Sequence, residues 1–164
     1  MLSLTILADV FTKSNAPWFV AFGFPFFFVG LWLLITFIIS RTSGWARIAQ
    51  SYTADGPLSG TRFGWQSASF RGTNYNNSLN LGVDTEGLYM APMALFRAFH
   101  PPLFIRWMEI TAHPVKMWRM FEMIELRFQR TPDIPIRIRA TLASQLVVAS
   151  QGRFQVRYAN AAGM

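Results

Sequence analysis

The sequence contains no cysteine, which excludes disulfide bonds, thiolate metal sites and cysteine nucleophiles together. Histidine is nearly as scarce: His100 and His113 each precede a proline, and they lack the HxxxH or HExxH spacing of a zinc site. The chain also lacks the G-x-S-x-G pattern of a serine hydrolase and a glycine-rich phosphate loop. These absences predict a protein that is not an enzyme and that holds no metal or other cofactor.

Lysine is the next scarce residue. Of the 15 basic residues only Lys13 and Lys116 are lysines, so thirteen arginines supply most of the formal charge of +7. Arginine pairs with carboxylates and phosphates and stacks on aromatic rings, which make up 16% of the sequence. Because the arginines are scattered and accompanied by glutamates, we expect no nucleic-acid binding. The composition favours contact with anionic lipid headgroups or with an acidic partner subunit.

Charge is absent altogether from one long segment, which runs from Ser14 to Ser40. The hydrocarbon core of a bilayer is about 30 Å thick and needs about 20 apolar helical residues. We therefore predict a transmembrane helix over residues 16–40. Residues 1–15 place most of their apolar side chains on one helical face, and this segment is either an interfacial helix lying against the bilayer or a frayed terminus.

The predicted span offers a packing surface. Gly23 and Gly30 lie one heptad apart and leave two gaps in the side-chain layer, so we assign packing against a partner helix to Gly23, Gly30 and Trp32. The alternative is that the phenylalanine-rich surface of the span faces only lipid. The span contains no histidine, carboxylate or basic group, so we expect no axial ligand for haem or chlorophyll and no proton relay.

Aromatic and basic residues mark the two ends of the span. Trp18 at one end, with Arg41, Trp45 and Arg47 at the other, is predicted to form an interfacial collar at the headgroup level. More basic residues follow the span than precede it. The positive-inside rule then predicts that the N-terminus lies outside and the C-terminal domain in the cytoplasm. We expect a single-pass protein of the inner (cytoplasmic) membrane.

After the span the sequence changes from helical to strand periodicity. Residues 41–53 are predicted to form a juxtamembrane helix, which ends at the turn-forming segment 54–60. A β-rich domain is expected over 54–152 and a weakly patterned tail over 153–164. The expected strands cover 63–71, 79–83, 88–91, 103–110, 118–128 and 134–139, with an asparagine-rich turn at 72–77 and a helix at 141–151. This order predicts a small, mostly antiparallel α+β roll or barrel closed by a C-terminal helix.

The segment 87–110, GLYMAPMALFRAFHPPLFIRWMEI, resembles a known pattern. It is similar to the "GLYL…FR..HPPL.IPW.EI" run of uncharacterised bacterial single-pass membrane proteins that carry a pleckstrin-homology-like domain. The matching residues are Gly87, Leu88, Tyr89, Phe96, Arg97, His100, Pro101, Pro102, Leu103, Ile105, Trp107, Glu109 and Ile110, while Arg106 stands where the pattern has proline. The resemblance implies a split barrel capped by a helix, and lipid or protein binding rather than catalysis.

The candidate binding residues outside the span are basic or aromatic. We predict a docking surface around and after the Pro101-Pro102 connection, formed by Arg97, Phe99, His100, Arg106, Arg137 and Arg139. The favoured alternative for the connection is a structural corner whose aromatic side chains fill the core, and the alternative for Arg137 and Arg139 is a solvated strand face. Glu122 and Glu125 are expected on opposite faces of a strand, in surface ion pairs with Arg119 and Arg127.

Two functions fit this sequence. The first is a non-catalytic accessory or scaffold subunit that stabilises a larger bacterial integral membrane complex, with other integral membrane subunits as partners. Photosynthetic reaction-centre–antenna complexes and respiratory assemblies are the first examples to test. The second is a membrane-tethered, pleckstrin-homology-like module that binds anionic lipid or a protein partner.

Overall fold

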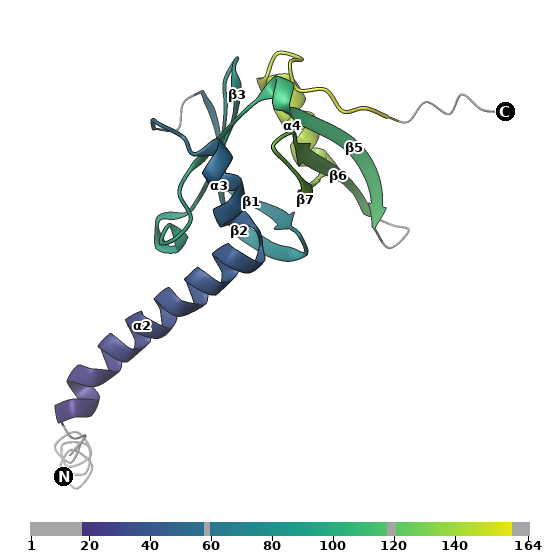
Figure 1. Ribbon diagram of the computed structural model, residues 1–164. Coiled ribbons are helices and arrows are strands. Elements are labelled where there is room, and N and C mark those ends of the chain that lie inside the picture. The colour runs from purple at the N-terminus through teal and green to yellow at the C-terminus, as the bar shows by residue number, and fades with distance from the viewer. Residues whose placement is uncertain (1–17, 58–59, 118–120, 159–164) are drawn as a thin grey trace, which may run out of the picture. The chain divides into compact units, whose positions relative to one another are not determined.

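The structure is a computed structural model that describes residues 18–57, 60–117 and 121–158 (Figure 1). The predicted interfacial segment 1–15 and the last six residues of the predicted tail lie outside this description. The chain divides into two compact units, one ending at Ile35 and the other beginning at Thr36.

Helix α2, Trp18–Thr42, is apolar on all sides. Its segment Gly23–Thr42 is long and apolar enough to cross a membrane. Phenylalanine side chains cover much of its exposed surface, and a helix without a polar face is typical of a membrane span or of a deeply buried element. The apolar helix predicted over residues 16–40 is therefore confirmed from residue 18, where the described part begins, and it ends two residues later than predicted.

Seven antiparallel strands form one curled sheet, which resembles half of a barrel (Figure 1). Their order across the sheet is β4-β3-β2-β1-β7-β6-β5. The strands are β1 Thr61–Phe70, β2 Thr73–Val83, β3 Gly87–Pro92, β4 Leu103–Arg106, β5 Ile110–Met117, β6 Phe121–Phe128 and β7 Thr131–Arg139. Helix α4, Ala140–Ala149, follows β7 directly and packs on β6 and β7. The predicted small antiparallel domain with a C-terminal helix is confirmed at this level.

The sheet has two halves, each built from consecutive hairpins. Strands β1 to β4 form one half and β5 to β7 form the other. In the described sheet the halves are joined where Ala68–Phe70 of β1 pairs with Ile136–Ile138 of β7. The segment that leads from β4 to β5 is the 3₁₀ helix η2, Trp107–Glu109, so the single strand predicted over 103–110 is wrong. The alternating apolar pattern does not indicate that the chain leaves one half of the sheet after β4 and enters the other half at β5.

The first hairpin turn is tighter than the sequence predicts. Phe70 pairs with Thr73, which leaves Arg71 and Gly72 as the two turn residues, with φ of 50° and 89°. Positive φ at both central positions is what a type I′ hairpin turn requires. The asparagine-rich turn predicted at 72–77 is therefore wrong. Asn74 and Asn76 lie on the exposed face of β2, where a strand tolerates polar side chains.

Helix α3, Trp45–Tyr52, belongs to the core of the domain. Four residues at helical spacing, Trp45, Ile48, Ala49 and Tyr52, are all buried. Ser43 and Gly44 separate α3 from α2, and Gly44 has φ 83°, with the Ile134 side chain 2.9 Å from the position of an added Cβ. The compact unit starts at Thr36 and includes α3, whereas the sequence placed the start of the domain at residue 54.

Candidate functional site

The last turns of α2 contact the segment that connects β3 to β4. This connection contains the 3₁₀ helix η1, Ala94–Phe96, and ends at Pro101 and Pro102, which block further helix. Ser40 Oγ donates a hydrogen bond of 2.6 Å to the carbonyl oxygen of Phe99. The rings of Phe37 and Phe99 meet edge to face, with centroids 5.4 Å apart. We call this region, residues 36–45 together with 94–101 and Tyr75, the junction.

A chain of buried hydrogen bonds runs through the junction. The oxygen atoms of Ser43 and Tyr75 are 2.9 Å apart, and Tyr75 Oη is 2.9 Å from His100 Nε2. His100 Nδ1 lies 3.0 Å from the carbonyl oxygen of Ala98, which can only accept. In the neutral imidazole Nδ1 therefore carries the proton, Tyr75 donates to Nε2, and Ser43 donates to Tyr75.

Burial keeps the two titratable members of this hydrogen-bonded series, Tyr75 and His100, uncharged. It lowers the pKa of His100 from 6.5, outweighing the hydrogen bond to Ala98, which raises it. Burial also raises the pKa of Tyr75 to about 12, although its hydrogen bond with Ser43 lowers it. The series of hydrogen bonds ends at the Ala98 carbonyl oxygen, which cannot pass a proton on. Its geometry therefore suits a structural role, in which it holds the three segments together, rather than proton transfer.

Trp45 lies at the centre of the junction and is completely buried. Its ring packs against Phe70, Tyr75 and His100, and its Nε1 donates to the carbonyl oxygen of Pro101 at 2.9 Å. The prediction that Trp45 belongs to an interfacial collar is therefore wrong. A tryptophan shortly after an apolar span can serve the core of the next domain as well as the headgroup boundary, and its side chain alone does not distinguish the two roles.

The sequence patterns did not single out Ser40, Ser43 and Tyr75. A signal was present, because Thr36, Ser40 and Ser43 follow i, i+4, i+7 spacing at the end of an otherwise apolar helix, and all three are buried. A polar stripe at helical spacing indicates a contact face. The partners of that face, Tyr75 and Phe99, are 32 and 59 residues away in the sequence and are not visible in such a pattern.

The residues predicted to pack against a partner in the span are open or half-buried, whereas the collar residues Arg41 and Arg47 contact other side chains of this protein. A Cβ added to Gly23 or Gly30 would meet no atom within 4 Å, apart from nearby helix backbone that any residue there would face. Trp32 is half-buried. The side chain of Trp18 lies outside the described part of the chain. Arg41 lies over the ring of Phe37, 5.1 Å from its centroid, and the exposed Arg47 pairs with Asp133 at 2.7 Å.

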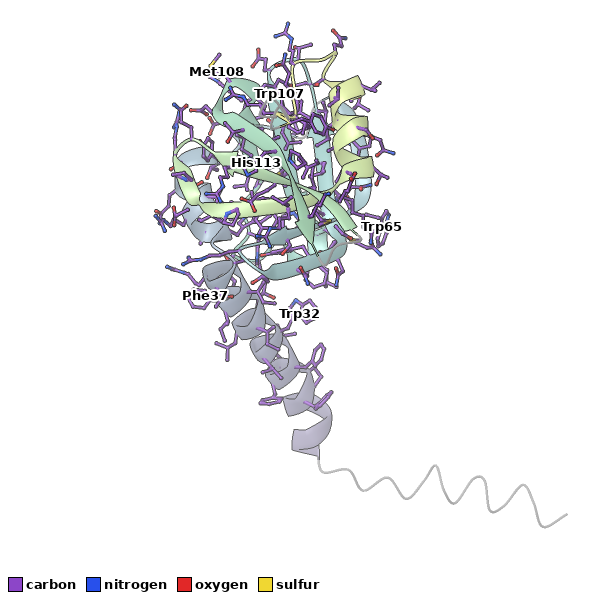
Figure 2. The ribbon with its side chains drawn as sticks, turned by 90° about the vertical axis from the view of Figure 1, so that its right-hand side faces the viewer. Trp32, Phe37, Trp65, Trp107, Met108 and His113 are labelled. Carbon is purple, nitrogen blue, oxygen red and sulfur yellow. The ribbon has the colours of Figure 1, made fainter. Side chains whose placement is uncertain are left out.

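The six residues predicted to form a docking surface are not gathered in one place. Arg97 and Phe99 are exposed at the junction, but His100 is buried there, which contradicts its place on a docking surface and agrees with the alternative of a structural corner. Arg106 lies beside Trp107 and Met108, while Arg139 lies beside Trp65. Figure 2 shows Phe37, Trp107 and Trp65, which mark these three places, on separate parts of the domain.

Arg137 takes part in an ion-pair cluster around the buried carboxylate of Glu125. Glu125 is 4% exposed and accepts hydrogen bonds from Arg127 Nε at 2.9 Å and Arg137 Nε at 3.1 Å, while His113 Nε2 is 3.5 Å away. Burial of Glu125 raises its pKa, but the two arginines outweigh this effect and hold the pKa below 4.5. The surface ion pair expected with Arg127 is present, but its carboxylate is buried, because three neighbouring strands place His113, Glu125 and Arg137 in one row.

Lowering the pH is expected to destabilise the domain through His100. Its neutral form contributes fully above the unfolded-state pKa of 6.5, and this contribution is lost as the pH falls from 6.5 toward the lowered pKa of the folded state. The loss is at most about 1.4 kcal/mol per pH unit. Urea unfolding of the full chain in mild detergent between about pH 7.5 and pH 5 measures it.

The control for this prediction is His100→Gln, which cannot titrate. The variant retains His113 and Glu125, so the difference between the two pH profiles isolates His100. Parallel profiles for the two proteins would contradict the assigned role of His100.

Within the described residues no group of three histidine, aspartate or glutamate side chains could hold a metal ion. Comparisons of this chain with protein-family models and with curated proteins give no match.

Proposed function

We propose that this chain is a single-pass membrane protein that serves as a non-catalytic scaffold subunit of a larger integral membrane complex. The observation that carries the proposal is the junction, where the last turn of α2 is part of the domain core. Thr36, Ser40 and Ser43 are buried, and only Ser43 and Gly44 separate the end of α2 from the start of α3. A partner that contacts residues 36–42 would therefore also contact the domain, and this favours a scaffold subunit over a module at the end of a long linker.

The surface of α2 supports the same proposal. At Gly23 and Gly30 the helix backbone is open to close approach, and small residues at such positions favour helix–helix packing in membranes. The partners in this proposal are other integral membrane subunits. The surplus of basic residues after the span supports an inner-membrane location with the domain in the cytoplasm.

We also propose a pleckstrin-homology-like classification for the domain. The resemblance of residues 87–110 supports it. A four-stranded and a three-stranded half, joined at one strand pair and followed by a helix, agree with the split, helix-capped barrel that this resemblance implies. Such a fold is compatible with many binding functions and does not by itself select one.

Affinity purification from gently solubilised native membranes tests the scaffold proposal. We expect the chain to migrate on native gels with a larger species, and mass spectrometry of that species to identify integral membrane proteins. Migration as a monomer under every mild detergent condition would overturn the proposal.

Replacing Gly30 with leucine is expected to reduce the amount of co-purified partner roughly tenfold, which corresponds to about 1.4 kcal/mol. A Cβ added at Gly30 meets no described atom within 4 Å beyond the nearby helix backbone, so we expect the larger side chain to interfere mainly with a neighbouring helix. Quantitative mass spectrometry of the purified complex measures the change. Phe28→Trp, which adds bulk at an exposed position on the opposite side of α2, is the control and should leave the yield unchanged. Equal yields for Gly30→Leu and wild type would show that this face contacts only lipid.

A further inference from the structure

Three apolar side chains are exposed at the junction. Phe37 on α2 is 39% exposed, and Leu95 and Phe99 on the β3–β4 connection are 66% and 50% exposed. Phe99 has φ of 62°, a left-handed backbone conformation that bulky residues rarely adopt. The hydrogen bond from Ser40 to the Phe99 carbonyl holds the segment against α2 in this conformation. The exposure of Phe99 is therefore imposed by the surrounding structure.

The contact with α2 also indicates how deep residues 95–99 lie in a membrane that α2 crosses. Arg41 is the first charged residue after the apolar segment of α2, and it marks the headgroup level of a spanning helix. Phe37 precedes Arg41 by four residues, or about 6 Å along the helix axis. Because the Phe37 and Phe99 rings are in contact, Phe99 lies at the depth of Phe37, on the apolar side of Arg41. The Arg41 guanidinium lies over the Phe37 ring, so this ring is in contact with the charged group that marks the headgroup level.

We infer that residues 95–99 insert into the boundary between headgroups and acyl chains of the membrane that α2 crosses, as a second membrane contact of the domain. This inference rests on the proposed insertion of α2. Amphipathic elements at an interface extend from the headgroups to about 5–10 Å below them, and the Phe37 backbone, about 6 Å below that of Arg41, lies within this range. The exposed Arg97 next to Phe99 suits anionic headgroups, so the occupant of this surface is lipid.

Site-specific labelling tests the insertion directly, because the native chain has no cysteine to react in the background. Three full-length variants, Leu95→Cys, Ile38→Cys and Met108→Cys, are labelled with an environment-sensitive fluorophore. They are reconstituted into phosphatidylcholine vesicles containing phosphatidylglycerol. Ile38 is an exposed reference on α2, and Met108 is an exposed control at the end of the domain away from Phe37 (Figure 2).

Quenching by a lipid spin-labelled near its headgroup is compared with quenching by aqueous iodide. We expect position 95 to be quenched by the lipid as strongly as position 38, and position 108 to be quenched only by iodide. Adding Phe99→Asn to the Leu95→Cys protein should reduce lipid quenching about fivefold, since it removes a half-exposed apolar ring. Asparagine tolerates the left-handed conformation and retains the backbone carbonyl that Ser40 contacts, so the fold should be unchanged.

The possible outcomes separate this inference from the proposed function. Lipid quenching at position 38 with iodide quenching at position 95 would overturn the insertion of residues 95–99 and leave the anchor standing. Iodide quenching at both positions would overturn the anchor as well. Protection of position 95 from both quenchers would identify a protein contact on this surface and would also overturn the inference.

Discussion

Replacing Trp45 with alanine is expected to lower the free energy of unfolding of the sheet domain by about 4 kcal/mol. The indole is completely buried, and removing it leaves a cavity between Phe70, Tyr75 and His100. The carbonyl oxygen of Pro101 also loses its donor. For a domain of this size the change corresponds to a fall in the melting temperature of roughly 20 °C, which far-UV circular dichroism in detergent would measure.

Two further tryptophan variants make this prediction specific. Trp45→Phe retains an aromatic ring but loses the N–H group, so we expect a loss of about 2 kcal/mol. Trp65→Ala, at a side chain that is 68% exposed, is the matched control and should cost about 0.5 kcal/mol or less. If Trp45→Ala cost no more than Trp65→Ala, the position of Trp45 at the centre of the junction would be wrong.

Replacing Gly87 with alanine is expected to destabilise the domain by about 3 kcal/mol. The new Cβ would collide with the carbonyl oxygen of Ile105 and lie 2.9 Å from the Phe104 ring. Gly87 is the first residue of β3 and pairs with Arg106 of β4, and its N–H also donates a hydrogen bond to the Asp84 side chain. Because the strand backbone cannot move away without breaking this register, the strain remains in the folded state. Chemical denaturation of the full chain measures the loss.

Gly72→Ala is the matched glycine control for this prediction. No described atom lies within 4 Å of its added Cβ, so the cost is limited to the left-handed backbone at φ 89°, about 1 kcal/mol. A Gly87→Ala protein as stable as Gly72→Ala would show that β3 and β4 do not approach each other as closely as the structure has them.

Much of the secondary structure could be predicted from the sequence, but little of the junction could. The alternation of Leu79, Leu81 and Val83 predicted a strand because each strand exposes alternate residues to the core. The same alternation predicted a strand through residues 107–109, where the chain instead forms the 3₁₀ helix η2. The sequence placed His100 on a docking surface, whereas its burial depends on Tyr75 and Trp45, which come from β2 and α3.

The apolar helix, the β3 hairpin and the helix after β7 followed from the order of residues alone, because periodicity and turn residues act over a few neighbouring positions. Only the tertiary structure decided that α3 belongs to the core, that Ser43, Tyr75 and His100 form one hydrogen-bonded chain, and that Phe99 lies against the end of α2. The physical reason is distance along the chain. Ser40 and Phe99 are 59 residues apart, so their contact exists only after the sheet has brought β2, β3 and β4 together.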